Sequence, residues 1–422
     1  MFLISYLLEY NRYLNFVGIA VILLIAWFFS RKRSSIDFKL VFSALGLHFV
    51  IGYIMLKVRF GQVVVQSIAY GVSQLYQAAD AGTSFLFGSL SDVGGPWGPI
   101  FAIKVLPTII FFGAFMALLF HFGIVQRVVA AISLLIRPIL GTTGAETLCA
   151  ISNSFLGQTE APLLVREYLK DMTRSEFLLV MVSGMGTISG ALLVVFASIG
   201  VPITHLLAAS VMGIPASILI AKILLPETEK SKTKKVAVSM ERKTSNMFDA
   251  LFAGTSDGLQ LALNVGAMLI SFLALLALIN AVLSYGSAGL NDLFVWMGIS
   301  WQMPLLSINV IFAYLFAPFG YLLGFTGAEA LKAGELLGTK VAVNEFVAYG
   351  NLVESGLSAR TTSIITYALC GFSNFSCIGI QLGGIGALVS GKRKWLAEFG
   401  LTAVLGGALA NLLSAMVASL LI

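Results

Sequence analysis

Apolar runs of about 20 residues recur along the whole chain and are separated by short polar segments. A helix of that length spans the hydrocarbon core of a bilayer. The pattern therefore predicts an all-α polytopic membrane protein without a separate soluble domain. Crossing helices are expected at 14–29, 40–56, 99–122, 176–198, 201–225, 247–283, 362–388 and 396–422.

Two segments are too polar in the middle to cross as single lipid-facing helices. They cover residues 137–174 and 326–351. Non-helical backbone at membrane depth is tolerated only where protein or a water-filled cavity covers it. We therefore expect two re-entrant helical hairpins, the first turning at Gly157. Because an odd number of crossing helices separates them, the two hairpins should be inverted relative to each other.

Three further segments are less regular. Residues 62–90 place apolar side chains at helical spacing among polar ones, which suits an interfacial helix, although burial against protein is equally open. Gly94-Gly95-Pro96 interrupts the chain before the third crossing helix. The segment 303–323 is apolar but contains Pro318 and Gly320, and the sequence leaves open whether it crosses.

The basic residues favour one orientation of the helices. They cluster beside apolar spans at 31–33, 227–243 and 392–394. The positive-inside rule puts these clusters in the cytoplasm and both termini outside. It also accounts for the net charge of +6, so the expected partner is the lipid bilayer and no nucleic acid.

One short pattern occurs twice, and each copy is followed by an acidic residue, Glu160 or Glu345. The copies are Thr143-Gly144-Ala145-Glu146 and Thr326-Gly327-Ala328-Glu329. A threonine followed three residues later by glutamate is typical of a capping box, so both threonines are expected to be N-caps. A carboxylate at membrane depth is costly, so Glu160 and Glu345 should face a cavity or a partner.

Two crossing helices have a middle rich in small and polar residues, at 183–190 and 371–377. Inverted repeats with broken helices are typical of secondary transporters, which bind substrate and ion near the midplane. The nearby amides, hydroxyls and carboxylates suit a neutral, polyhydroxylated ligand. The sequence shows neither a metal set of histidines nor a paired intramembrane aspartate motif, so no enzyme is expected.

Three motifs together resemble the concentrative nucleoside transporter family. They are Gly157-Gln158-Thr159-Glu160-Ala161-Pro162-Leu163, Asn344-Glu345-Phe346-Val347-Ala348-Tyr349 and Ala368-Leu369-Cys370-Gly371-Phe372-Ser373-Asn374. The resemblance covers the chain from about Gln62 to its end. It implies eight crossing helices, two re-entrant hairpins in an inverted repeat, an interfacial helix and a homotrimer. The short N-terminal part resembles bacterial members, which implies the bacterial inner membrane.

The resemblance also implies a division into a fixed scaffold and a moving transport domain. Residues 1–122 would be mainly scaffold, 123–226 the first repeat of the transport domain, 227–246 a cytoplasmic loop, 247–300 a scaffold helix and 301–422 the second repeat.

The same resemblance implies roles for individual residues. Gly157 would belong to the substrate site, and the residues after it, Gln158, Thr159 and Glu160, would read the nucleobase, with Leu192 and Phe372 on its faces. Glu345 and Asn374 would bind ribose hydroxyls. Cys377 stands where the family usually has serine, and its thiol is a weaker hydrogen-bond partner. A sodium ion would be held by the Asn153 side chain, the Leu156 carbonyl, the Thr187 hydroxyl and the Ile188 carbonyl. No organic cofactor is implied.

The expected function is import of nucleosides such as uridine or adenosine, driven by the sodium gradient through elevator-type alternating access. Coupling to protons through Glu160 or Glu345 is one alternative, and a passive nucleoside-permeable channel is another. The choice between purines and pyrimidines stays open.

Overall fold

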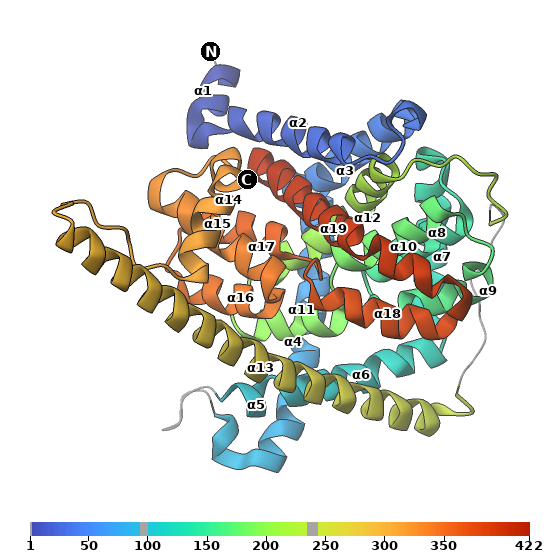
Figure 1. The fold of residues 1–422 in the computed structure, drawn as a ribbon. Helices are drawn as coiled ribbons and strands as arrows, with labels where there is room; N and C mark the ends of the chain where they lie inside the picture. Colours follow the sequence, from blue (N-terminus) through green and yellow to red (C-terminus); the bar gives the residue numbers. More distant parts are fainter. Residues whose placement is uncertain (1, 93–99, 234–243) are drawn as a thin grey trace.

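A computed structural model describes residues 2–92, 100–233 and 244–422, and within these ranges the regular elements are all helical. The predicted break at Gly94-Gly95-Pro96 lies outside the described residues. The helices, shown in Figure 1, are α1 (Phe2–Leu8), α2 (Tyr13–Phe28), α3 (Phe38–Lys57), α4 (Arg59–Phe87), α5 (Phe101–Lys104), α6 (Leu106–His121), α7 (Ile124–Leu140), α8 (Gly144–Asn153), α9 (Arg166–Leu169), α10 (Arg174–Gly186), α11 (Gly190–Ser198), α12 (Ile203–Leu224), α13 (Met247–Trp296), α14 (Ile308–Leu322), α15 (Gly327–Ala342), α16 (Glu345–Glu354), α17 (Ala359–Leu369), α18 (Ser376–Leu388) and α19 (Arg393–Leu421).

Six segments of the described chain are long and apolar enough to cross a membrane. They are α3, α5 with α6, α10 with α11, α12, α13 and α19. Helix α2 and the broken pair α17 and α18 complete the eight expected crossing helices. The mixed segment at 62–90 is indeed one long helix, α4, and it is not among the six.

The first repeat, expected at 123–226, contains a helix before the hairpin that no apolar run of crossing length marks. Amphipathic α7 lies between Gly123 and Gly141, both with positive φ, and continues through Pro138. It precedes the first hairpin as α14 precedes the second. Helix α14 turns by 115° into α15, and Gly324 stands at this turn with φ 87°. Residues 303–323 therefore do not run on into α15 as one straight span.

The basic helix ends converge on one face. The backbone N–H of Arg31, after α2, donates to the carbonyl of Leu224 at the end of α12, 3.0 Å away. Glu398 near the start of α19 pairs with both Arg31 and Arg174, so α10 also begins here. Four helix ends predicted to lie in the cytoplasm thus meet on the same side of the molecule.

The two hairpins start from opposite faces. On this basic face, the Thr143 hydroxyl at the start of α8 accepts a hydrogen bond from Thr233 in the loop after α12. On the other face, the carbonyl of Leu323 just before α15 accepts from Ser419 at the far end of α19. The expected inversion of the two copies is therefore present in the fold.

Both chain ends lie on the face opposite the basic helix ends. Figure 1 shows them close together. The Tyr6 hydroxyl donates to the carbonyl of Leu420, and the Arg12 guanidinium donates to the carbonyl of Ile422 at 3.3 Å. The first helices therefore cap the end of α19.

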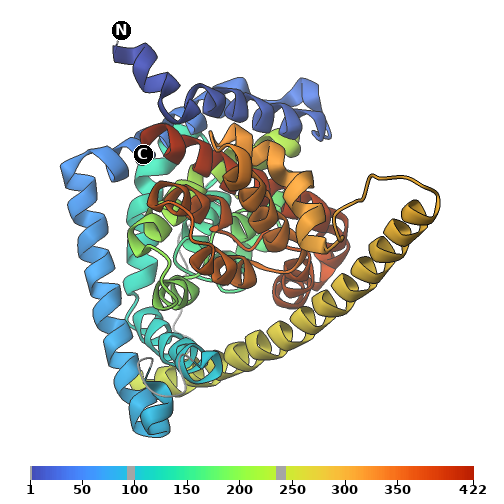
Figure 2. The same ribbon diagram turned by 90° about the vertical axis from the view of Figure 1, so that its left-hand side faces the viewer.

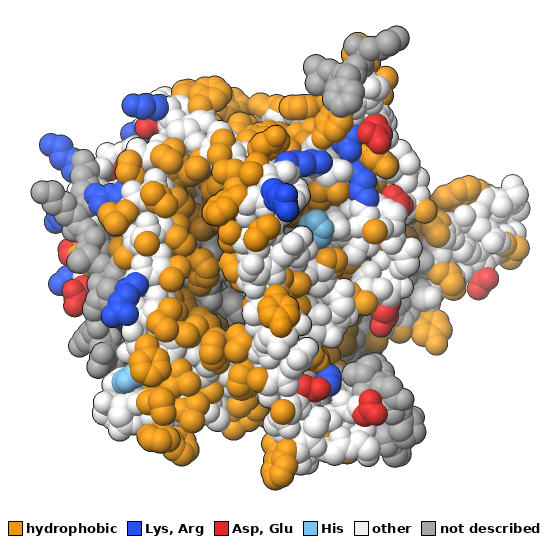
Figure 3. All heavy atoms as spheres, turned by 180° about the vertical axis from the view of Figure 1, so that it is seen from behind, with side chains coloured by type: hydrophobic (Ala, Val, Ile, Leu, Met, Phe, Trp, Pro, Cys, Tyr) orange, Lys and Arg blue, Asp and Glu red, His pale blue; other side chains and the backbone are white. Residues whose placement is uncertain are grey.

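Two long helices, α4 and α13, run along the outside of the molecule (blue and yellow in Figure 2). Helix α13 continues to Trp296, beyond the expected end at 283, because Tyr285 and Gly286 do not interrupt it. Glycines let it approach α6 closely: a Cβ on Gly254 would lie 2.6 Å from the carbonyl of Gly113. Hydrophobic side chains cover much of the face in Figure 3, as a lipid-facing surface requires.

Candidate functional site

Two crossing helices are broken near the centre of the fold. Helix α10 ends at Gly186, and α11 starts after Ser189, whose hydroxyl accepts from the N–H of Leu192 as an N-cap does. Helix α17 ends at Leu369 and α18 starts at Ser376. Each break exposes carbonyls at a helix end and N–H groups at a helix start.

The second hairpin places Glu345 at its tip. Asn344 caps α16 by accepting from the N–H of Val347 at 2.9 Å, so Glu345 becomes the first residue of the helix. Its carboxylate accepts from the amide of Asn374, in the break before α18, at 2.9 Å. Asn374 in turn accepts from the N–H of Cys377 at 3.0 Å. The second hairpin tip is thus tied to the start of α18.

The first hairpin tip reaches the same helix start through Gln158. Its amide donates to the sulfur of Cys377 at 3.2 Å, and its carbonyl accepts from Gln381 on α18 at 3.0 Å. Close approach requires Gly184 on α10, where a Cβ would lie 2.9 Å from that of Gln158. One chain of contacts therefore joins both hairpin tips, and we call it the tip network. It consists of Gln381, Gln158, Cys377, Asn374 and Glu345.

Gln381 is a member of the tip network that the sequence analysis missed. It is fully buried and also donates to the carbonyl of Met181 at 3.0 Å. The available signal was a lone amide in the apolar stretch of α18. Buried amides in such helices need hydrogen-bond partners, so a lone glutamine at this position indicates a candidate site residue.

Other predicted site residues stand apart from the tip network. Thr159 packs against α18, where a Cβ on Gly384 would lie 2.4 Å from its methyl group. Glu160 is exposed, and the one hydrogen bond of its carboxylate in the described structure is a long one from the N–H of Gly157, at 3.4 Å. In the described structure the carboxylate of Glu160 therefore shares no hydrogen-bond partner with that of Glu345.

Leu192 and Phe372 are both buried and stand at the two breaks. Leu192 lies in the first turn of α11, and Phe372 lies between α17 and α18. Each is thus an apolar side chain next to helix ends that offer hydrogen bonds.

The four residues predicted to hold sodium lie together at the end of α8 and the break after α10. The Thr187 hydroxyl donates to the carbonyl of Asn153 at 2.9 Å, and the Asn153 amide donates to Ser183 at 2.9 Å. Leu156 and Ile188 are fully buried beside them. The side-chain oxygen of Asn153 is buried without a hydrogen-bond partner in the described residues. An unpaired buried oxygen costs free energy, and a hard cation such as sodium would satisfy it.

Both threonines occupy the expected N-cap position, but the capping box forms only at the first hairpin. The N–H of Thr143 donates to the carboxylate of Glu146 at 2.7 Å, as in a capping box. Thr326 makes no side-chain cap, and Glu329 instead accepts from the hydroxyl of Thr361. The φ of 52° at Gly327 distorts the entry to α15, which explains the difference.

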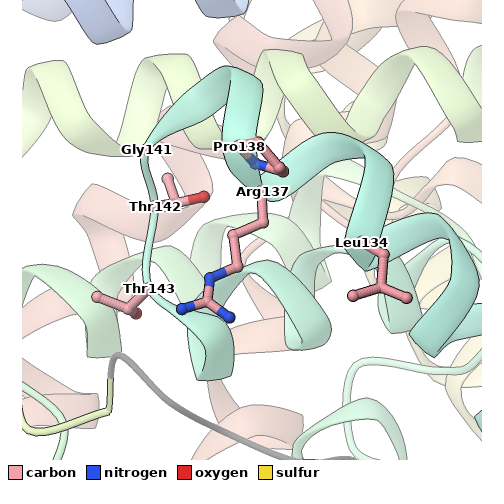
Figure 4. A pocket seen from close by; sticks show the side chains of 6 residues that line it. All are labelled: Leu134, Arg137, Pro138, Gly141, Thr142 and Thr143. Atoms are coloured by element: carbon pink, nitrogen blue, oxygen red, sulfur yellow. The ribbon is translucent and has the colours of Figure 1, made fainter.

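A surface hollow lies where α7 leads into α8 (Figure 4). Its lining consists of Leu134, Arg137, Pro138, Gly141, Thr142 and Thr143. It is on the basic face, where the first hairpin begins, and contains none of the predicted substrate or ion residues. We therefore do not assign it to the candidate site.

Three family models match consecutive parts of the chain. Residues 17–90 match "Na+ dependent nucleoside transporter N-terminus", 102–202 match "Nucleoside recognition" and 205–419 match "Na+ dependent nucleoside transporter C-terminus".

Individual proteins and structures agree with these matches. Nucleoside permease NupC of Helicobacter pylori is 38% identical, with 98% of each chain covered. Sodium/nucleoside cotransporter 1 of rabbit is 37% identical over 97% of this chain and 63% of its own. The structure of CNTnw in an inward-facing substrate-bound state is 36% identical, covers 97% of both chains and has a TM-score of 0.87. A variant of CNTnw in an outward-facing state is 35% identical with the same TM-score and coverage.

Proposed function

Because this chain belongs to the family of Na+-dependent, concentrative nucleoside transporters, we propose that it imports nucleosides by coupling them to sodium. It is a multi-pass membrane transporter of nucleosides and not an enzyme, and it works by alternating access. The proposal concerns the coupling ion, the roles of the residues and the moving parts.

The tip network is the observation that carries the proposed substrate site. It joins two hairpins from opposite faces through side chains that donate and accept hydrogen bonds. An ionised Glu345 accepts only, which suits ribose hydroxyls, and Asn374 holds it in place. Gln158 offers an acceptor and donors at once, which suits the edge of a nucleobase. Thr159 and Glu160 would complete the base site when the first hairpin moves.

The unpaired oxygen of Asn153 supports sodium as the coupling ion. It lies between the end of α8 and the break at Thr187, where Leu156 and Ile188 would supply carbonyls. Oxygen ligands of this kind suit a hard cation. A bound sodium would tie the first hairpin to α10 and so order the base half of the site. The inward sodium gradient would then drive uptake.

We infer that the two repeats, 123–226 and 301–422, move together against the scaffold, which includes 247–300 and most of 1–122. The close glycine packing of α13 on α6 supports a rigid outer frame. The exposed apolar surface of α13 is available to other copies in a homotrimer. The basic face would be cytoplasmic, with both termini outside the bacterial inner membrane.

Uptake by proteoliposomes tests this function. Membranes containing the protein should accumulate labelled uridine or adenosine only with an inward sodium gradient. Equal uptake with choline in place of sodium at constant pH would exclude sodium coupling. Uptake that follows a pH gradient without sodium would instead indicate proton coupling, and flux without accumulation would indicate a channel. Competition by unlabelled nucleosides, nucleobases and nucleotides then defines the substrate.

A further inference from the structure

Lys340 is a buried cation that the proposed mechanism does not use. It lies near the end of α15 in the second hairpin, and only 1% of it is exposed. Within the described residues it forms none of the ion pairs. Its ammonium donates instead to the carbonyl of Ala368 at 2.9 Å and to the side-chain oxygen of Asn411 at 2.6 Å. A buried charge is costly without strong partners, so this arrangement needs an explanation.

Asn411 connects the ammonium to both helix breaks. Its amide donates to the carbonyl of Gly186, the last residue of α10, and to the carbonyl of Cys370, just after α17, each at 2.7 Å. Its oxygen also accepts from Ser373 at 3.3 Å. Carbonyls at helix C-termini carry partial negative charge. The positive charge of Lys340 therefore lies where the carboxyl ends of two half-helices converge.

Two matching hydrogen bonds show which part of the first repeat corresponds to Lys340. In the first repeat the N–H of Gly190, at the start of α11, donates to the carbonyl of Phe155 in the hairpin at 3.0 Å. In the second, the N–H of Phe375, before α18, donates to the carbonyl of Val341 at 3.3 Å. Aligning the repeats on these bonds puts Lys340 opposite the residue after Asn153, within the segment 153–156.

We propose that Lys340 is a tethered cation that takes, in the second repeat, the place that sodium takes in the first. This inference rests on the proposed sodium site at Asn153 and Thr187. The first hairpin would gain a positively charged link to its broken helix, beyond its hydrogen bonds, only when an ion binds. The second hairpin is fastened permanently, by the ammonium on the carbonyl of Ala368 and on Asn411.

The permanent contact makes Lys340 a positioning residue for the ribose half of the site. Through Asn411 and Ser373 it fixes the segment between α17 and α18. The next residue, Asn374, holds Glu345. Loss of the ammonium should loosen Asn374 and Glu345, whereas Asn411 still holds the carbonyl of Gly186 beside Thr187. Loss of the ammonium should therefore lower the affinity for nucleoside and leave the affinity for sodium nearly unchanged.

The test is to measure both affinities on purified full-length protein, using sodium alone and then uridine at saturating sodium. Lys340→Met keeps the length of the side chain and removes its charge. We expect uridine to bind at least about tenfold more weakly, as for loss of hydrogen bonds from a charged group, while sodium affinity stays within about twofold of wild type. Lys332→Gln, a partly exposed lysine of the same helix, is the control and should change neither.

A second variant removes the shared partner. Asn411→Leu loses the bonds to both breaks, so uridine and sodium affinity should fall together. Unchanged uridine binding in Lys340→Met would overturn the inference, and so would a parallel loss of both affinities, which indicates a merely structural role. If Lys340→Met does not fold, Lys340→Gln is measured in the same way. Absence of sodium-dependent uridine binding in wild type would instead refute the proposed function.

Discussion

The two hairpin tips stand at equivalent places in the repeats, yet they are built differently. The first runs irregularly from α8 through residues 154–160 into a short 3-10 helix, and it leaves the oxygen of Asn153 unpaired. The second passes almost directly from α15 into α16 and is held by Lys340. One tip therefore has an unpaired acceptor for a mobile ion, while the other is stabilised by a charge of its own chain.

This difference assigns separate tasks to the two tips. A tip that depends on an ion can couple its position to a gradient, because binding free energy is supplied only when the ion is present. A tip fastened by its own side chain gives a constant platform for the substrate. Substitutions at one tip, at both breaks and at the contact between the tips should therefore have different effects.

The largest effect is expected at the second tip. Glu345→Gln removes the charged acceptor proposed for ribose hydroxyls and weakens the contact with Asn374. Uptake of uridine into proteoliposomes at saturating sodium should fall by at least about tenfold, and by up to about a hundredfold. Glu354→Gln, at the exposed end of the same helix, is the control. Wild-type uptake by Glu345→Gln would remove this carboxylate from the proposed site.

The first tip should respond to sodium rather than to substrate. Asn153→Ala removes the unpaired oxygen, so the sodium concentration for half-maximal uptake should rise by about tenfold or more. At very high sodium the maximal rate should partly recover. Asn264→Ala, on the exposed surface of α13, is expected to behave as wild type. An unchanged sodium dependence of Asn153→Ala would show that the ion binds elsewhere.

Both breaks should be disturbed by Gly371→Ala. A Cβ at this position would lie 2.4 Å from the side-chain oxygen of Asn411 and 2.7 Å from the carbonyl of Met185. Overpacking of this kind costs about 1–3 kcal/mol, so the melting temperature in detergent should drop by several degrees. Gly379→Ala on α18, where a Cβ meets nothing within 4 Å, is the matched control. Equal melting temperatures for the two variants would contradict the close packing of the breaks.

The smallest effect is expected where the two tips meet. Cys377→Ser replaces a sulfur acceptor by a hydroxyl, a stronger partner for the amide of Gln158. Uridine affinity should increase by about two- to fivefold, which corresponds to less than one ordinary hydrogen bond. Sodium affinity should not change. A weaker affinity for uridine would mean that the larger sulfur atom, and not its hydrogen bond, matters at this contact.

The sequence was sufficient for the crossing helices, both hairpins and their inversion, because hydropathy and interrupted apolar runs determine them. It was insufficient for α7, which no apolar run of crossing length marks, and for the end of α13. In α13 the glycine at 286 is tolerated within a helix of 50 residues. A single glycine costs about 1 kcal/mol relative to alanine, and the many bonds of a long helix outweigh that cost.

The central contacts depend on residues far apart in the chain. Asn411 and Gln381 each stand alone in an apolar segment, and Lys340 lies in the more polar second hairpin. Periodicity does not reveal which buried groups these three residues meet. Their partners come from other helices, more than 25 positions away in every case. The sequence identified the motif residues through a family resemblance, whereas the fold alone reveals how they are connected.

The single side chain of Asn411 has a kinetic consequence. Its amide bonds to the carbonyls of Gly186 and Cys370 at once, so neither half-helix can swing away without disturbing the other. The two helix breaks should then rearrange together, in one step with one activation barrier. Relaxation after a sodium jump should follow one exponential, without an intermediate in which only one break has rearranged.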